Sequence, residues 1–128
     1  LCFGTLLAAA QTVGEHLDAT VVNMRFVKPL DGELLLRLTE RHRAFVTIEE
    51  NAVAGGAGSG VAEFLSSQQV TMPILHLGIP DQFIEHGSRE DCLTAAGLDA
   101  RSIQQAIESW WSRQTGSASG SMYRPRTG

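Results

Sequence analysis

A glycine-rich segment is the first candidate for binding chemistry in the sequence. Residues 55–60 read Gly-Gly-Ala-Gly-Ser-Gly and lie between a predicted strand and a predicted helix, where backbone amides can face an anion. The segment lacks the Gly-x-Gly-x-x-Gly register of dinucleotide-binding folds and the Gly-Lys-Ser/Thr ending of a P-loop. Close packing of the helix and positive φ angles are structural uses of the same glycines. A phosphate- or nucleotide-binding module therefore stays an alternative hypothesis.

Two carboxylates and an amide precede these glycines, at the end of the predicted strand. They are Glu49, Glu50 and Asn51. Adjacent strand residues point to opposite faces of a sheet, so only one of the two carboxylates can face inward. Acid–base catalysis by a pair would require both to converge on one substrate. Loop ordering or contact with another domain is favoured, and an acid beside glycine amides can close a loop through backbone hydrogen bonds.

The histidines and hydroxyls give weaker signals. The histidines are His16, His42, His76 and His86. No two of them have the spacing of a helical zinc site. His86 follows Glu85, which could orient or charge it, although a solvated loop histidine is the plainer interpretation. Ser59 is outside the Gly-x-Ser-x-Gly register of a hydrolase nucleophile. Arg25 and Lys28 could hold an anion, but salt bridges to a neighbouring acidic domain explain them more simply.

Composition restricts the classes of function. The 128 residues are 43% hydrophobic, enough for one core, and carry a formal net charge of −4 without a basic cluster, so nucleic acid is not expected as a partner. No apolar run approaches the roughly 18 residues of a membrane span. Cys2 and Cys92 stand far apart, which predicts neither a disulfide framework nor a thiolate metal site. A cytoplasmic protein is expected.

Hydrophobic periodicity predicts the elements that must position these groups. We expect strands over 1–4, 20–24, 44–49 and 73–78, and helices over 6–17, after Asp31, near the glycines, over 88–97 and from Asp99 onward. This order predicts an α/β fold with a mostly parallel, open sheet covered on both faces, a three-layer α/β/α arrangement. Functional loops would lie at the carboxyl ends of the strands. From Gly116 onward the residues are mostly small and polar, and residues 113–128 are predicted to form a flexible tail behind a domain of residues 1–112.

Three segments in these loops carry a family resemblance. They are Arg-Phe-Val-Lys-Pro-Leu-Asp at 25–31, Thr-Ile-Glu-Glu-Asn-Ala-Val-Ala-Gly-Gly-Ala-Gly-Ser-Gly-Val at 47–61, and Gly-Ile-Pro-Asp-Gln-Phe-Ile-Glu-His-Gly at 78–87. In this order they resemble the C-terminal domain of the 1-deoxy-D-xylulose-5-phosphate synthase family, within the transketolase-like enzymes that depend on thiamine diphosphate. The first and third strings favour this family over the equivalent domains of transketolase and of 2-oxo-acid dehydrogenase β subunits.

The resemblance implies a transketolase C-terminal-like domain whose first strand precedes Leu1, the third domain of a longer parent enzyme. That parent would use thiamine diphosphate and Mg²⁺ to condense pyruvate with glyceraldehyde 3-phosphate, with loss of CO₂, for isoprenoid, thiamine and pyridoxal biosynthesis. It would be a cytoplasmic homodimer. The present chain is expected to bind no cofactor, to be inactive alone, and to pack on the upstream domains and support the dimer.

The resemblance assigns no catalytic, cofactor-binding or metal-binding residue to this chain. By position, it implies interdomain or dimer contacts at Arg25, Phe26, Lys28, Asp31, Glu49, Glu50, Asn51, Gly56, Gly58 and His86. Without its neighbours, the chain is also expected to self-associate through apolar surface around Phe26, Val27, Val53 and Ala54.

Overall fold

A small parallel sheet forms the centre of the protein. The computed structural model describes residues 1–25, 29–52, 56–79 and 93–115. Within them, strands β1 (Cys2–Phe3), β2 (Phe45–Ala52) and β3 (Ile74–Ile79) pair in the order β1-β2-β3, all parallel. The helices are α1 (Leu7–Leu17), α2 (Gly32–Thr39), α3 (Ala57–Ser67) and α5 (Ala100–Thr115).

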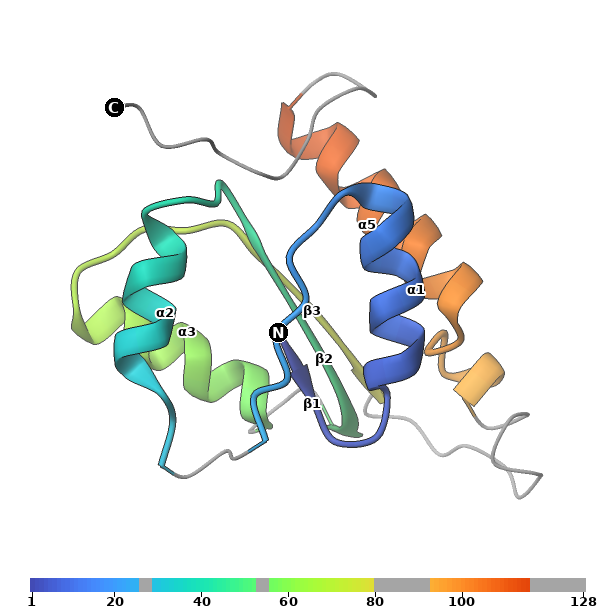
Figure 1. The fold of residues 1–128 in the computed structure, drawn as a ribbon, viewed down its shortest axis with the longest axis horizontal. Helices are drawn as coiled ribbons and strands as arrows, with labels where there is room; N and C mark the ends of the chain where they lie inside the picture. Colours follow the sequence, from blue (N-terminus) through green and yellow to red (C-terminus); the bar gives the residue numbers. More distant parts are fainter. Residues whose placement is uncertain (26–28, 53–55, 80–92, 116–128) are drawn as a thin grey trace.

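The helices form a layer on each face of the sheet. Helices α1 and α5 cover one face, and α2 and α3 cover the other (Figure 1). Each interface has its own apolar cluster. The first contains Ala10, Val13, Ile48, Ile103, Ile107, Trp110 and Trp111, and the second contains Phe3, Met24, Leu35, Phe45, Val61 and Leu65. The predicted three-layer α/β/α fold is therefore confirmed.

Because residues alternate along β2, its side chains pack against the two helical layers in turn. Val46 and Ile48 pack in the cluster under α1 and α5, whereas Phe45 packs in the cluster under α2 and α3. Both faces of the strand are thus buried, as expected for a parallel strand between two layers of helices. Thr47 and Glu49 share the face of Phe45 and have no exposed surface, so they lie under α3.

The prediction of a strand over residues 20–24 was wrong. Only one bridge forms there, between Cys2 and Asn23. The Cys2 amide donates to the Val22 carbonyl at 2.8 Å, and the Met24 amide donates to the Cys2 carbonyl at 2.9 Å. Since β1 is only two residues long, its outer edge cannot pair with more of this β-branched run.

Helix α5 matches its prediction closely. The stripe of Ile103, Ile107, Trp110 and Trp111 is buried, and the guanidinium of Arg43 lies 5.2 Å from the centre of the Trp111 ring. At the start of the helix, hydrogen bonding by Ser102 lowers the pKa of Asp99. The helix extends to Thr115, so residues 113–115 are helical, and the rest of the predicted tail lies outside the described residues.

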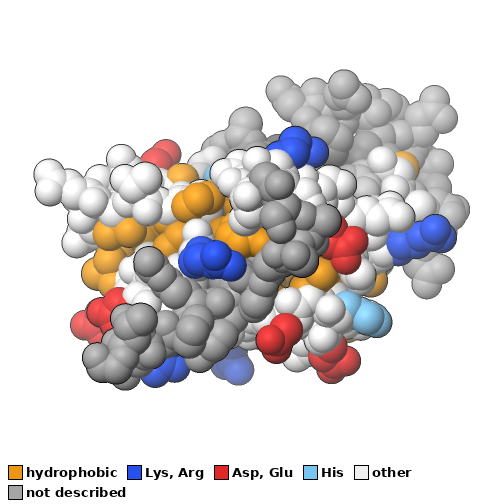
Figure 2. Space-filling model, turned by 90° about the horizontal axis from the view of Figure 1, so that it is seen from above, with side chains coloured by type: hydrophobic (Ala, Val, Ile, Leu, Met, Phe, Trp, Pro, Cys, Tyr) orange, Lys and Arg blue, Asp and Glu red, His pale blue; other side chains and the backbone are white. Residues whose placement is uncertain are grey.

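Hydrophobic and charged side chains are mixed on one end of the molecule. Seen from above, hydrophobic groups gather in a band, with Lys, Arg, Asp and Glu side chains scattered around it (Figure 2). Among the residues described on this face, no concentrated basic patch is visible.

Asp31 is the N-cap residue of α2. The amide of Leu34 donates to its Oδ1 atom at 3.1 Å. We expect Asp31→Ala to lower the free energy of unfolding by about 1 kcal/mol, because one amide of the first turn loses its acceptor. Asp31→Asn keeps an acceptor at this position, so its free energy of unfolding should fall by only a few tenths of a kcal/mol. Urea unfolding of the two variants measures the difference, and equal losses would contradict the capping role.

Candidate functional site

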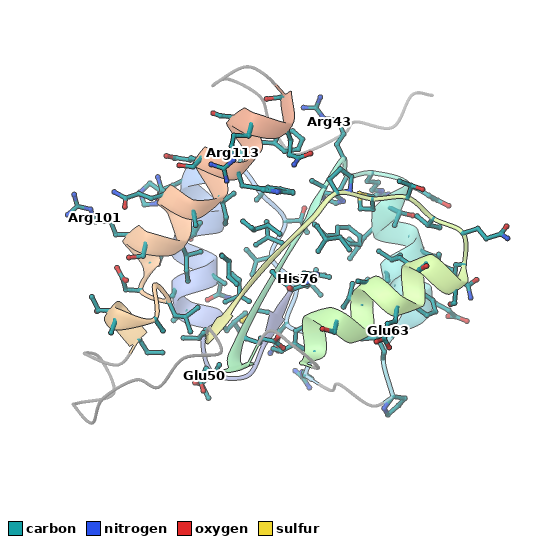
Figure 3. The ribbon with its side chains drawn as sticks, turned by 180° about the vertical axis from the view of Figure 1, so that it is seen from behind. Arg43, Glu50, Glu63, His76, Arg101 and Arg113 are labelled. Carbon is teal, nitrogen blue, oxygen red and sulfur yellow. The ribbon has the colours of Figure 1, made fainter. Side chains whose placement is uncertain are left out.

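The carboxyl ends of β1 and β2 meet at one edge of the sheet. Phe3 pairs with Glu49 in register, and the hydroxyl of Thr5, just beyond β1, donates to the carboxylate of Glu50. Glu50 lies at this end of the strands, and Arg43 lies at the opposite end (Figure 3). This is the edge at which parallel α/β folds place their functional loops.

Glu49 faces the interior of the chain and caps α3 from a neighbouring strand. Its Oε2 atom accepts hydrogen bonds from the amides of Ala57 at 2.6 Å and Gly58 at 3.3 Å. These amides belong to the first turn of α3, where no residue of the helix itself can accept from them. The N-cap residue, Gly56, has no side chain to do so. The loop-closing role suggested by the sequence is therefore the one that Glu49 performs.

The second oxygen of the same carboxylate is unusual. Glu49 Oε1 is buried, and it has no hydrogen-bond partner among the described residues. Glu50, the next residue, is only half-buried and bonds Thr5 instead. The alternation of strand residues thus separates the two adjacent acids, and no paired acid–base site forms between them.

A threonine and a histidine from neighbouring strands form a polar pair under α3. Thr47 Oγ1 and His76 Nδ1 are 2.7 Å apart, and the two residues are opposite each other in the β2–β3 register. His76 lies between β3 and α3 (Figure 3). A hydroxyl beside an imidazole is the geometry of an activated nucleophile, but Thr47 is fully buried and no substrate can reach it. Sequence reasoning missed this pair because only the register brings the two residues together.

The other described histidines have structural roles. The Nδ1 atom of buried His42 is 3.0 Å from the Leu38 carbonyl, and its Nε2 atom is 2.9 Å from the Thr20 hydroxyl. Because a carbonyl only accepts, the Nδ1 atom of His42 donates to Leu38. Exposed His16 bonds the carbonyl of Thr12 within α1. In the described part of the chain, no three His, Cys, Asp or Glu residues cluster as metal ligands.

The residues expected at domain contacts divide into inner and outer groups. Arg25, Asp31 and Glu50 have side chains that reach the surface, whereas Glu49 and Gly58 are buried within this chain. Arg25 also has a φ of 53°, uncommon for a residue with a side chain, and the Asn23 side chain accepts from its amide at 3.2 Å. Gly56 is half-buried and Asn51 lies in β2, while Phe26, Lys28 and His86 are outside the described residues.

Comparison with known proteins gives the family. The family model described as transketolase, C-terminal domain, matches residues 2–103. The chain belongs to this transketolase C-terminal domain family. A split-gene transketolase solved as an inactive β4 tetramer has the same fold, with a TM-score of 0.74 and 35% identity, covering 84% of this chain and 36% of that one.

Curated 1-deoxy-D-xylulose-5-phosphate synthases are more similar in sequence than that transketolase. The chain is 57% identical to the Xylella fastidiosa synthase over 111 residues, 87% of this chain and 18% of the relative. It is 60% identical to the Thioalkalivibrio sulfidiphilus synthase over 107 residues, 84% of this chain and 17% of the relative. The resemblance of this transketolase C-terminal domain to the synthases is confirmed, and the chain spans less than a fifth of their length.

No helix in the part of the chain that the structure describes is long and apolar enough to cross a bilayer.

Proposed function

We propose that the chain works as the C-terminal domain of a 1-deoxy-D-xylulose-5-phosphate synthase. The whole enzyme would condense pyruvate with glyceraldehyde 3-phosphate, with loss of CO₂, in the cytoplasm, and so supply isoprenoid, thiamine and pyridoxal biosynthesis. The observation that carries this proposal is 57% identity to a curated synthase over 87% of the chain. Identity to the split-gene transketolase is lower, at 35%, which favours the synthase over transketolase.

Thiamine diphosphate and Mg²⁺ would be held by other domains of the parent. The described residues do not fit them, since they offer no cluster of three metal ligands and the first amides of α3 already bond Glu49. Thiamine diphosphate supplies an electron sink for the carboligation when bound. The same engaged amides disfavour the alternative of a stand-alone phosphate- or nucleotide-binding module.

The task of this domain would be docking on the upstream domains and support of a homodimer. The carboxyl edge of the sheet suits that task, because it carries the carboxylate of Glu50, and Arg25 comes two residues after the parallel bridge between Cys2 and Asn23. The split-gene transketolase that shares this fold forms an inactive tetramer of its β chain. That relative supports the expectation that the present chain is inactive without its partner domains.

A domain exchange tests the proposal. We would replace the matching C-terminal segment of the Xylella fastidiosa synthase by residues 1–115 of this chain and assay 1-deoxy-D-xylulose 5-phosphate formation. The chimera is expected to be active and dimeric, and the 128-residue chain alone is expected to be inactive. A folded, dimeric chimera that forms no product would contradict the proposed function.

Charge reversal in the chimera tests the docking edge. Arg25→Glu should weaken assembly or lower activity at least about tenfold, since close charge pairs at an interface couple by roughly 1.5–7 kcal/mol and about 1.4 kcal/mol corresponds to tenfold. Arg113→Glu is the matched control, because Arg113 is also exposed but lies near the opposite end of the sheet (Figure 3). Equal effects of the two reversals would contradict docking at the carboxyl edge.

A further inference from the structure

The strand β1 begins in the interior of the fold. The N-terminus lies in the middle of the molecule, between the two helical layers (Figure 1). The amino group of Leu1 donates to the carbonyl of Val46 at 2.7 Å, and the amide of Ile48 donates to the Leu1 carbonyl at 2.9 Å. These are the evenly spaced bonds of a parallel ladder, so Leu1 already continues the pairing of β1 with β2 in the direction of the N-terminus.

Backbone groups on both sides point to the position ahead of β1. Hydrogen-bonding groups of successive residues point to alternate sides of a strand. The Phe45 amide donates toward β3, so the next amide of β2, that of Val46, points to the β1 side. In the run over 20–24, the carbonyl of Val22 accepts from the Cys2 amide, so the Val22 amide points to the same position from the other side. A strand between the two would pair with both.

An apolar cavity of about 80 Å³ lies beside the amino group of Leu1. Its wall toward α1 and α5 includes Val13, Leu17 and Ile107, and its wall toward α2 includes Leu38. Burial lowers the pKa of the amino group to about 6, because a positive charge is poorly solvated among apolar side chains. A peptide amide in the same place would donate the same hydrogen bond without burying a charge.

We propose that this cavity takes an extended apolar segment that directly precedes Leu1 in the parent polypeptide and lengthens β1. The segment would run parallel to β2 and to residues 20–22, and it would make this β-branched run a full strand of the sheet. A second copy of the chain would have to bring a chain end against the Leu1 amino group, whereas a directly preceding segment is already joined there.

The inference rests on the proposed function for the existence of a longer parent. The present chain spans 18% of the Xylella fastidiosa synthase, so a parent of that kind has ample chain to supply the segment. The cavity and the backbone groups around it are properties of this domain, and they can be tested without the synthase reaction.

Alternation along β1 determines where each added side chain points. Leu1 and Phe3 pack in the cluster under α2 and α3, whereas Cys2 packs in the cluster under α1 and α5. The residue directly before Leu1 therefore points toward α1, where Val13 and Leu17 line the cavity. We expect an apolar side chain at this position, because a carboxylate there would be buried without a partner.

Short extensions of the 128-residue chain test this requirement. We would place Val-Val-Val before Leu1 and compare it with Val-Val-Asp, which differs only at the residue that points toward α1. The Val-Val-Val chain should melt about 5–10 °C higher than the chain that begins at Leu1, since it buries additional apolar surface. The Val-Val-Asp chain should show no such rise.

Hydrogen exchange shows where the added segment lies. In the Val-Val-Val chain, the amides of Val22 and Val46 should exchange at least about tenfold more slowly, because each gains an acceptor in the new strand. The amide of Val21 points to the other side of its run, so its exchange rate should change little.

Three results would overturn the proposal. The Val-Val-Asp extension could stabilise the chain as much as Val-Val-Val does, or the amides of Val22 and Val46 could exchange at unchanged rates in the Val-Val-Val chain. The third result is protection of these two amides in the unextended chain that grows with protein concentration, which would assign the cavity to a second copy. None of these measurements assays catalysis, so their outcome is independent of whether the synthase chimera is active.

Discussion

Replacing Gly58 by alanine is expected to lower the free energy of unfolding by about 3 kcal/mol, through overpacking and damage to a buried hydrogen bond. A Cβ atom at this position would lie 2.5 Å from both Thr47 Oγ1 and His76 Nδ1. Neither side chain can move aside cheaply, because they bond each other at 2.7 Å on neighbouring strands. Urea unfolding followed by circular dichroism measures the loss.

Gly60→Ala is the matched control for this prediction. Gly60 belongs to the same helix, and a Cβ atom there would meet nothing within 4 Å. Alanine loses less backbone freedom than glycine when a helix forms. The free energy of unfolding of this control should therefore be higher than that of the wild type by roughly 0.5–1 kcal/mol. If the two substitutions changed stability alike, the close approach of α3 to the sheet at Gly58 would be refuted.

Stopping the chain after Ile103 is expected to abolish folding. The truncated helix would lose Ile107, Trp110 and Trp111, all of which are buried in the cluster between α1, α5 and the sheet. Removal of each such side chain costs about 2–5 kcal/mol, and the sum matches or exceeds the whole stability of an ordinary domain, about 5–15 kcal/mol. Circular dichroism of the truncated chain should show no cooperative unfolding transition.

A chain ending at Thr115 is the control for the truncation. It keeps all of α5. We expect its free energy of unfolding to lie within about 0.5 kcal/mol of that of the full chain, because residues 116–128 are predicted to bury little surface. A cooperative transition in the chain that ends at Ile103 would contradict the role of the tryptophans. The contrast matters for the limits of the domain, since the family match ends at residue 103, in the first turn of α5.

Local patterns were sufficient to predict most of the fold. The apolar run of β2 and the stripe of α5 are signals within one element, and both elements form where the sequence places them. The prediction of a strand over residues 20–24 was wrong because a strand needs a partner of matching length, and the neighbouring strand β1 has only two residues. Pairing length is a tertiary property that the run itself does not encode.

The candidate site was predictable only in part, for a related reason. Alternation along β2 requires one of Glu49 and Glu50 to face inward, but which one depends on how the two faces of the sheet are covered. The pairing of Thr47 with His76 depends on the β2–β3 register, which no spacing along the chain reveals. Both features become visible only when strands from distant parts of the sequence are aligned.

The two faces of the sheet also differ in how firmly they hold their helices. Contacts between α1, α5 and the sheet are apolar, so they are non-directional and tolerate small shifts of the helices when side-chain volumes change. Helix α3 has apolar contacts too, but it is also fixed by two directional hydrogen bonds that its amides donate to Glu49 and by the close approach of Gly58 to the polar pair beneath it. Among related chains, α3 should therefore keep its position on the sheet while α1 and α5 move together to absorb changes in the core.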